Sequence, residues 1–174
     1  MKRSHIQQMP KYFDRYINLV DDVDVVEALK KYGEAYLEKE KTALEQLGDK
    51  AYAPGKWTVK ELLQHLIDAE RIFAYRALRF ARNDTTALHG FDEDHYAKNA
   101  QTKNRTVSEL LEEFALQRKS NVLLFNSFDK ETLMREGTAS GNTISVLALG
   151  FTMTGHVIHH MNVLKERYFP LLKV

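Results

Sequence analysis

The stretch from Thr154 to Arg167 reads TGHVIHHMNVLKER and places His156 and His160 four positions apart. On an α-helix, residues i and i+4 lie one above the other on the same face, so both imidazoles can point at one spot between neighbouring helices. A helix commonly offers two nitrogen ligands to a metal in this way. The pair needs a third ligand, and because the chain has no cysteine, the candidates are histidine, aspartate and glutamate.

The surrounding residues predict that this pair is buried. A helix is expected over residues 144–168, with Asn142 or Thr143 as its cap and Pro170 beyond its end. Apolar side chains cover nearly every face of its first half, which is typical of a helix at the centre of a bundle or at a subunit interface. The two histidines continue one apolar stripe of this helix, formed with Leu149, Met153 and Leu164.

A third histidine, His65, lies on the inward face of another predicted helix, residues 59–83. Apolar residues recur there at helical spacing, at Leu62, Leu66, Ala69, Phe73 and Leu78. Taken alone, this helix favours a core histidine that is hydrogen-bonded to a carbonyl or carboxylate group. Three buried imidazoles are easier to satisfy around one cation than separately, so we interpret His65, His156 and His160 as ligands of one divalent metal ion per chain.

The identity of the metal is left open by the residues. Imidazole suits several transition metals, and we expect zinc or nickel, with iron or manganese as alternatives. Three neutral imidazoles leave at least one position for water or substrate, which is typical of a catalytic site. His159 is turned about 100° around the helix axis from His160, so we assign it to support of the ligands or to an interface. No catalytic side chain can be named from the sequence.

Composition restricts the class of protein and its partners. The 174 residues fit a single domain, 1–174, and Lys+Arg 25 against Asp+Glu 24 gives a formal charge of +1. This balance provides no basic field for nucleic acid or an anionic membrane surface. No apolar run approaches the ~20 residues of a membrane span, and the segment MKRSHIQQMP lacks the apolar run of a signal peptide. We expect a cytoplasmic protein with a small-molecule substrate.

The chain is predicted to be all-α. Its three prolines lie outside the long periodic stretches. Asp24 and the capping boxes that begin at Thr58 and Thr106 mark the starts of three helices. Four helices are expected, near 25–47, 59–83, 107–127 and 144–168. The aromatic residues before Asp24 have no clear period and predict a structural N-terminal strap with at most one helical turn.

The longest connection, residues 84–105, is polar and aperiodic, so it is predicted to be a structureless lid or crossover. Fully extended it spans about 70 Å, more than the ~37 Å of a 25-residue helix, so the helices on either side can run parallel. His89 and His95 lie here and are interpreted as solvated. Arg118, in the following helix, is predicted to be solvated or snorkelling rather than an anion clamp.

Two segments together resemble a known family. One is PGKWTVKELLQHLIDAE, residues 54–70, with Trp57 before the cap and His65 seven positions after it; the other is GHVIHHMNVLKERY, residues 155–168. In this order they resemble the DinB/YfiT-like superfamily of four-helix-bundle metalloproteins. The loop GFDEDHY, residues 90–96, is also similar to members of this group. The likeness extends over nearly the whole chain.

The resemblance implies an up-down-down-up bundle, frequent homodimers, and metal ligands at His65, His156 and His160. It also implies relatives that are thiol-dependent transferases or isomerases using bacillithiol, mycothiol or glutathione. We therefore expect a metal-dependent enzyme, a low-molecular-weight-thiol S-transferase or a related transferase or hydrolase. The alternative is a non-catalytic metal-binding stress-response protein. A cleft beside the histidines, lined by Tyr, Arg or Asp from residues 84–105, would favour the enzyme.

Overall fold

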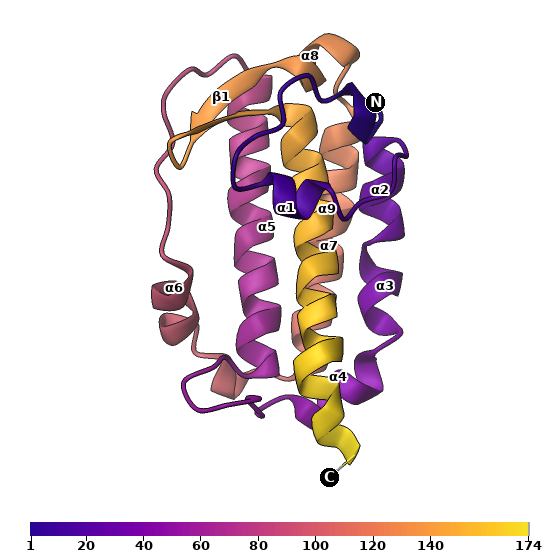
Figure 1. The fold of residues 1–174 in the computed structure, drawn as a ribbon, viewed down its shortest axis with the longest axis vertical. Helices are drawn as coiled ribbons and strands as arrows, with labels where there is room; N and C mark the ends of the chain where they lie inside the picture. Colours follow the sequence, from indigo (N-terminus) through magenta and orange to yellow (C-terminus); the bar gives the residue numbers. More distant parts are fainter. Residues whose placement is uncertain (174) are drawn as a thin grey trace.

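The computed structural model describes residues 1–173, which are mostly helical. Four helical segments lie side by side along the long axis of the molecule (Figure 1). Three of them are the long helices α5 (Val59–Ala81), α7 (Val107–Asn126) and α9 (Val146–Val163). The first is made of the short helices α2 (Val25–Lys31), α3 (Glu34–Glu38) and α4 (Lys41–Leu47). The prediction of one continuous helix over 25–47 is therefore wrong, because three short helices occupy this range.

The first segment breaks at Gly33. A Cβ atom at this position would lie 3.1 Å from the carbonyl oxygen of Leu29 and 3.2 Å from Cγ of Arg118. The break leaves the carbonyl groups of Leu29 and Tyr32 without helical partners, and both accept hydrogen bonds from Nη1 of Arg118, at 3.3 and 3.2 Å. The arginine thus replaces the backbone donors that a continuous helix would supply.

Arg118 is buried, so the prediction that it is solvated is wrong. It is 2% exposed, and its Nε and Nη2 donate to the two carboxylate oxygens of Glu70 at 2.7 and 2.9 Å. Asn121 donates to the same carboxylate at 2.9 Å. This network ties α7 to α5 and to the first segment. The helical period alone could not reveal it, because the acceptors come from segments distant in the sequence.

The capping boxes at the starts of α5 and α7 are confirmed. At α5 the hydroxyl of Thr58 accepts from the amide of Glu61 at 3.2 Å, and the carboxylate of Glu61 accepts from the amide of Thr58 at 2.7 Å. Thr106 and Glu109 repeat the pattern at α7. Both pairs satisfy amide groups that have no partner inside the helix, so they fix where these helices begin.

A two-stranded antiparallel hairpin precedes α9, which contradicts the all-α prediction. Strand β1 (Glu136–Ala139) pairs with β2 (Asn142–Ser145) across a turn at Ser140 and Gly141. Both turn residues have positive φ, 52° and 76°, as a two-residue hairpin of this twist requires. Strand β1 packs closely against α5, because a Cβ at Gly137 would lie 2.2 Å from the ring of Phe80.

The hairpin also shifts the start of the last helix. Asn142 and Thr143 lie in β2, and neither is the cap; Ser145 is, with its hydroxyl accepting from the amide of Ala148 at 3.1 Å. After α9 the chain continues through a π-helical turn, Leu164–Tyr168, and a 3-10 turn, Phe169–Lys173.

The connection between α5 and α7 is partly ordered rather than structureless. It contains the short helix α6 (Glu93–Asn99) and a 3-10 turn, Thr102–Asn104. Nη1 of Arg105 donates to Gln64 at 2.8 Å, so the start of α7 lies near the start of α5. The far ends of both helices meet in one hydrophobic cluster. The two helices therefore run in the same direction, as Figure 1 shows.

The N-terminal strap contains a 3-10 turn, Arg3–His5, and one helical turn, α1 (Asp14–Ile17), which packs across α9 (Figure 1). Between the hairpin and α7 lies the short helix α8 (Lys130–Met134). Most apolar residues predicted on α5 are buried, but Leu78 is 39% exposed. Within residues 1–173 no helix has both the length and the apolar character that crossing a membrane requires.

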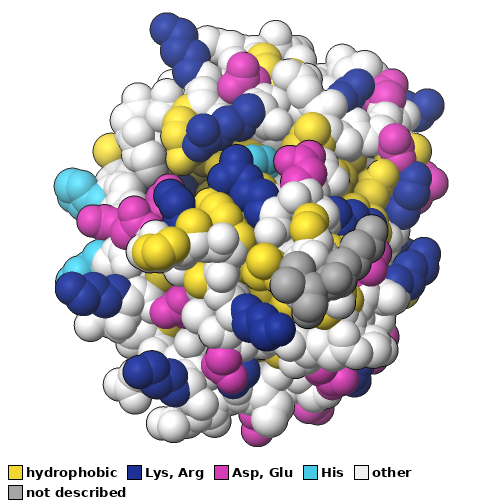
Figure 2. All heavy atoms as spheres, turned by 60° about the horizontal axis from the view of Figure 1, so that its bottom comes forward, with side chains coloured by type: hydrophobic (Ala, Val, Ile, Leu, Met, Phe, Trp, Pro, Cys, Tyr) yellow, Lys and Arg dark blue, Asp and Glu magenta, His cyan; other side chains and the backbone are white. Residues whose placement is uncertain are grey.

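Charged side chains of both signs are interspersed on the face where α5 begins and α9 ends (Figure 2). This distribution agrees with the formal charge of +1. No field of a single sign builds up on the face shown.

Candidate metal centre

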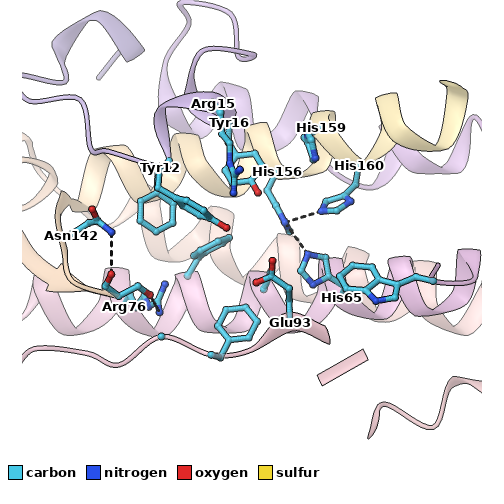
Figure 3. A pocket seen from close by; sticks show the side chains of 17 residues that line it. Tyr12, Arg15, Tyr16, His65, Arg76, Glu93, Asn142, His156, His159 and His160 are labelled. Carbon is cyan, nitrogen blue, oxygen red and sulfur yellow. Dashed lines mark hydrogen bonds between the residues drawn. The ribbon is translucent and has the colours of Figure 1, made fainter. Parts of the chain in front are cut away.

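The structure brings His65, His156 and His160 together between α5 and α9. Nε2 of His156 lies 3.0 Å from Nε2 of His65 and 3.0 Å from Nε2 of His160 (Figure 3). One ring nitrogen from each residue lies within 4.8 Å of the others. His65 and His156 are 7% and 5% exposed, and His160 is partly buried. The i, i+4 spacing on α9 and the inward face of α5 produce this convergence.

The three ring nitrogens are arranged as ligands of one cation rather than as partners in hydrogen bonds. Nε2 of His156 carries either one proton or one lone pair, so it can form a good hydrogen bond to only one of its two neighbours. The other contact would set two like groups against each other. Nitrogens bound at ~2.0–2.1 Å to one ion lie about 2.9–3.4 Å apart, which matches the 3.0 Å separations.

The protonation states also suit a metal. Burial lowers the pKa of His65 from 6.5 to about 4. Burial also holds the pKa values of His156 and His160 well below the usual range, and the positive charge of neighbouring histidines, among them His65 and His159, lowers both further. All three rings are therefore neutral near pH 7, each with a free lone pair, and this is the form that binds metal ions.

The N-terminal strap and the loop before α5 hold the rings in place. The Tyr16 ring packs edge-on against His156 with 5.2 Å between ring centroids. This contact needs Gly155, since a Cβ there would lie 1.9 Å from the carbonyl oxygen of Tyr16. On the other side, the ring of Trp57 lies 4.8 Å from that of His65, and the hydroxyl of Tyr168 donates to the Trp57 carbonyl at 2.6 Å.

The histidines form one end of a cleft of about 480 Å³. Its walls come from the strap, α5, α9, the hairpin and the start of α6 with the segment before it. The residues that line it include Tyr12, Arg15, Tyr16, Phe73, Arg76, Phe91, Glu93, Ser140 and Asn142. In Figure 3 the carboxylate of Glu93 points toward the histidines, and Arg76 and Asn142 lie at the opposite end. The site is thus open to a small molecule.

Most of these cleft residues were missed by the sequence reasoning. The sequence predicts a structural role for the strap, yet its Tyr12, Arg15 and Tyr16 line the site. Its aromatic residues without a period carry no signal that separates a core contact from a cleft wall. Arg76 did have a signal in the sequence, because residues 65, 69, 73 and 76 share one face of a helix, the face that holds His65.

The remaining histidines stay outside the cluster. His159 lines the cleft, 5.3 Å from Tyr16 between ring centroids, and does not join the other three. Its assignment to support of the ligands or to an interface stays a prediction. His89 and His95 are exposed, as expected for solvated residues. The carbonyl group of His89, rather than its ring, takes part in the cleft by accepting from Arg76 at 3.0 Å.

The fold and the site define a helical-bundle protein with a three-histidine candidate metal centre. Residues 14–164 match the family model described as the DinB superfamily, and the chain belongs to that superfamily. The match begins in α1 and ends just after α9, so it contains all three histidines.

Among solved structures, the chain is similar to YfiT from Bacillus subtilis, at 19% identity and a TM-score of 0.69. The similarity covers 91% of this chain and 87% of that one. YfiT is described as a probable metal-dependent hydrolase with an unusual four-helix bundle topology. At this identity the likeness establishes a shared fold. A search of curated proteins finds no match.

Proposed function

We propose that this chain is a divalent-metal-dependent enzyme for a small-molecule substrate, with His65, His156 and His160 as the metal ligands. The observation that carries the proposal is that three neutral imidazoles converge at one end of an open cleft of about 480 Å³. A cation that only held α5 and α9 together would need no such cleft. Residues 84–105 contribute Gly90, Phe91 and Glu93 to the cleft, and none of the Tyr, Arg or Asp side chains that the sequence led us to expect there.

A divalent cation held by three imidazoles would act as a Lewis acid and lower the pKa of a coordinated water or thiol. The side chains supply the other parts of the chemistry. The Glu93 carboxylate is placed to accept a proton near the histidines. Burial raises the pKa of Tyr16 to about 12, so its hydroxyl keeps its proton and can donate to substrate.

Two reaction types fit this arrangement: hydrolysis, and S-transfer from a low-molecular-weight thiol. The description of YfiT as a probable metal-dependent hydrolase supports the first. The second follows from the family resemblance, and because the chain has no cysteine, its thiol would be a cosubstrate. Zinc or nickel is the proposed metal.

The proposal includes the up-down-down-up order of the bundle, which the common direction of α5 and α7 supports. Organisation as a single domain, a homodimer and a cytoplasmic location stay predictions of the sequence.

The deciding experiment combines chelation with activity. Metal-loaded protein would be assayed for hydrolysis of an activated ester and for transfer of glutathione or bacillithiol to a chloronitroaromatic electrophile. Chelation should abolish either activity, and metal should restore it. A ligand at 100 times its dissociation constant contributes about 2.7 kcal/mol, so the melting midpoint should fall by roughly 5–11 °C while the helical circular dichroism at 25 °C is kept.

A matched pair of variants tests the role of the cleft. Glu93→Gln should lower kcat and keep the metal, whereas Glu112→Gln, on the exposed face of α7, should change neither. If chelation unfolds the chain at 25 °C, the cation is a structural clamp, and the non-catalytic alternative replaces the enzyme.

A further inference from the structure

Arg76 is a buried cation without a buried anion. It is 2% exposed, and its Nη2 donates to two neutral acceptors, the His89 carbonyl at 3.0 Å and the Ser140 hydroxyl at 2.9 Å. Among residues 1–173 no carboxylate lies within ion-pair distance of it. The neighbouring arginines of α5 differ, because Arg71 pairs with Glu113 and Arg79 pairs with Asp84.

This lack of a partner is costly. A charge that leaves water is usually paired with an opposite charge. Arg76 faces the His89 carbonyl, the Ser140 hydroxyl and the Phe73 ring, whose centroid lies 6.0 Å from its Cζ, and these neutral groups do not balance a full charge. Burial accordingly lowers the pKa of Arg76, with no opposing contribution from an acid. Arg118, the other buried arginine of the bundle, shows the usual solution, since Glu70 neutralises it. The position of Arg76 on the wall of the cleft provides access to an anion from outside the chain.

Backbone hydrogen bonds hold the groups around Arg76 in place. The hairpin turn that carries Ser140 is held against the segment before α6, where the Ser140 amide donates to the Leu88 carbonyl and the Leu88 amide donates to the Thr138 carbonyl, both at 2.9 Å. These bonds fix the hydroxyl that receives one guanidinium N–H. The remaining N–H groups of the fork are left for a ligand in the cleft.

We propose, on the basis of the function proposed above, that the Arg76 end of the cleft binds the carboxylate group of the substrate. The substrate would then be a small organic acid whose reacting group lies at the histidine end. The planar guanidinium group matches a carboxylate, with two parallel hydrogen bonds.

The rest of the cleft defines the body of this acid. Aromatic rings, of Tyr12, Tyr16, Phe73 and Phe91, line the cleft. They suit an apolar or aromatic portion. In Figure 3 the Glu93 carboxylate lies between Arg76 and the histidines, and its charge disfavours a doubly charged phosphate in the same space. Arg15, exposed and stacked on Tyr12 at 3.8 Å, adds positive charge at the rim.

The test uses metal-free full-length protein, so that its outcome does not depend on the metal or on turnover. Binding of 3-phenylpropanoate and of its neutral analogue 3-phenylpropanamide would be measured by calorimetry. In parallel, the Nε–H signal of Arg76 would be followed by NMR and assigned from its absence in Arg76→Lys. The acid should bind about 10- to 100-fold more tightly than the amide and should shift this signal.

Arg76→Gln should remove this preference, and Arg76→Lys, which keeps the charge but loses the fork, should retain only part of it. Arg82→Gln is the matched control, since Arg82 is exposed at the end of the same helix and should leave the preference intact. Equal affinities of acid and amide for the wild-type protein would overturn the proposal, even if an Arg76 variant did not fold. So would an unchanged preference in folded Arg76→Gln. Failure of the metal-dependent function would appear separately, in the metal and activity measurements.

Discussion

The buried ion pair between Glu70 and Arg118 provides the sharpest prediction about stability. Both side chains are nearly inaccessible, at 2% and 3% exposure, and two bonds of 2.7 and 2.9 Å join them. Glu70→Gln keeps the shape and leaves the Arg118 charge without an anion. Removing one partner of such a pair typically costs about 3–5 kcal/mol. For a domain of this size the melting midpoint should then fall by roughly 6–20 °C.

Arg118→Met should cost at least as much as Glu70→Gln. It leaves the carboxylate buried and also removes the donor to the carbonyl groups of Leu29 and Tyr32. A buried acceptor left without a partner costs about 1–3 kcal/mol. The first helical segment should therefore be destabilised together with the α5–α7 contact.

Urea denaturation of both single variants and the double variant measures these effects and their coupling. The single-variant costs should not add, because both variants break the same pair. Lys119→Met is the matched control: Lys119 pairs with Glu34 at 3.0 Å, but the two side chains are 65% and 52% exposed, and its loss should cost about 0–1 kcal/mol. If Arg118→Met costs no more than this control, the reasoning about the buried network is refuted.

Two further predictions concern pH and the strap. In metal-free protein, burial lowers the pKa of His65 from 6.5 to about 4, so the unfolded chain takes up a proton that the folded chain does not. The free energy of unfolding should decrease as pH falls from about 6.5 toward 4, by roughly 3 kcal/mol from this residue, and urea titrations that are flat over this range would contradict it. Gly155→Ala should push Tyr16 away from α9 and cost about 1–3 kcal/mol, so an unchanged urea midpoint would show that the close approach is unimportant.

The sequence predicted the histidine cluster because its signals are local. His156 and His160 share a face through their spacing, and His65 lies on the apolar stripe of a helix whose start a capping box marks. The helical spacing of apolar residues and the capping boxes at helix starts suffice to predict that such residues face the core. Which three nitrogens meet depends only on α5 and α9 packing together.

The rest of the site depends on contacts between distant segments. The hairpin has strands of four residues, which are too short for a reliable alternation of apolar and polar side chains. Its turn at Ser140 becomes part of the cleft only because it packs beside Arg76. The break at Gly33 likewise depends on Arg118, which comes from another helix. Tertiary contacts override local preference at these places.

The claim that three histidines hold one divalent cation is tested most directly by metal content. Protein purified without a histidine tag would be analysed by inductively coupled plasma mass spectrometry, alongside the single alanine variants of His65, His156 and His160. His159→Ala is the matched control, one residue away and outside the cluster. We expect one metal ion per chain in the wild type and in His159→Ala, and loss of the ion in each of the other three variants. Loss of the ion in His159→Ala with retention in His156→Ala would contradict it.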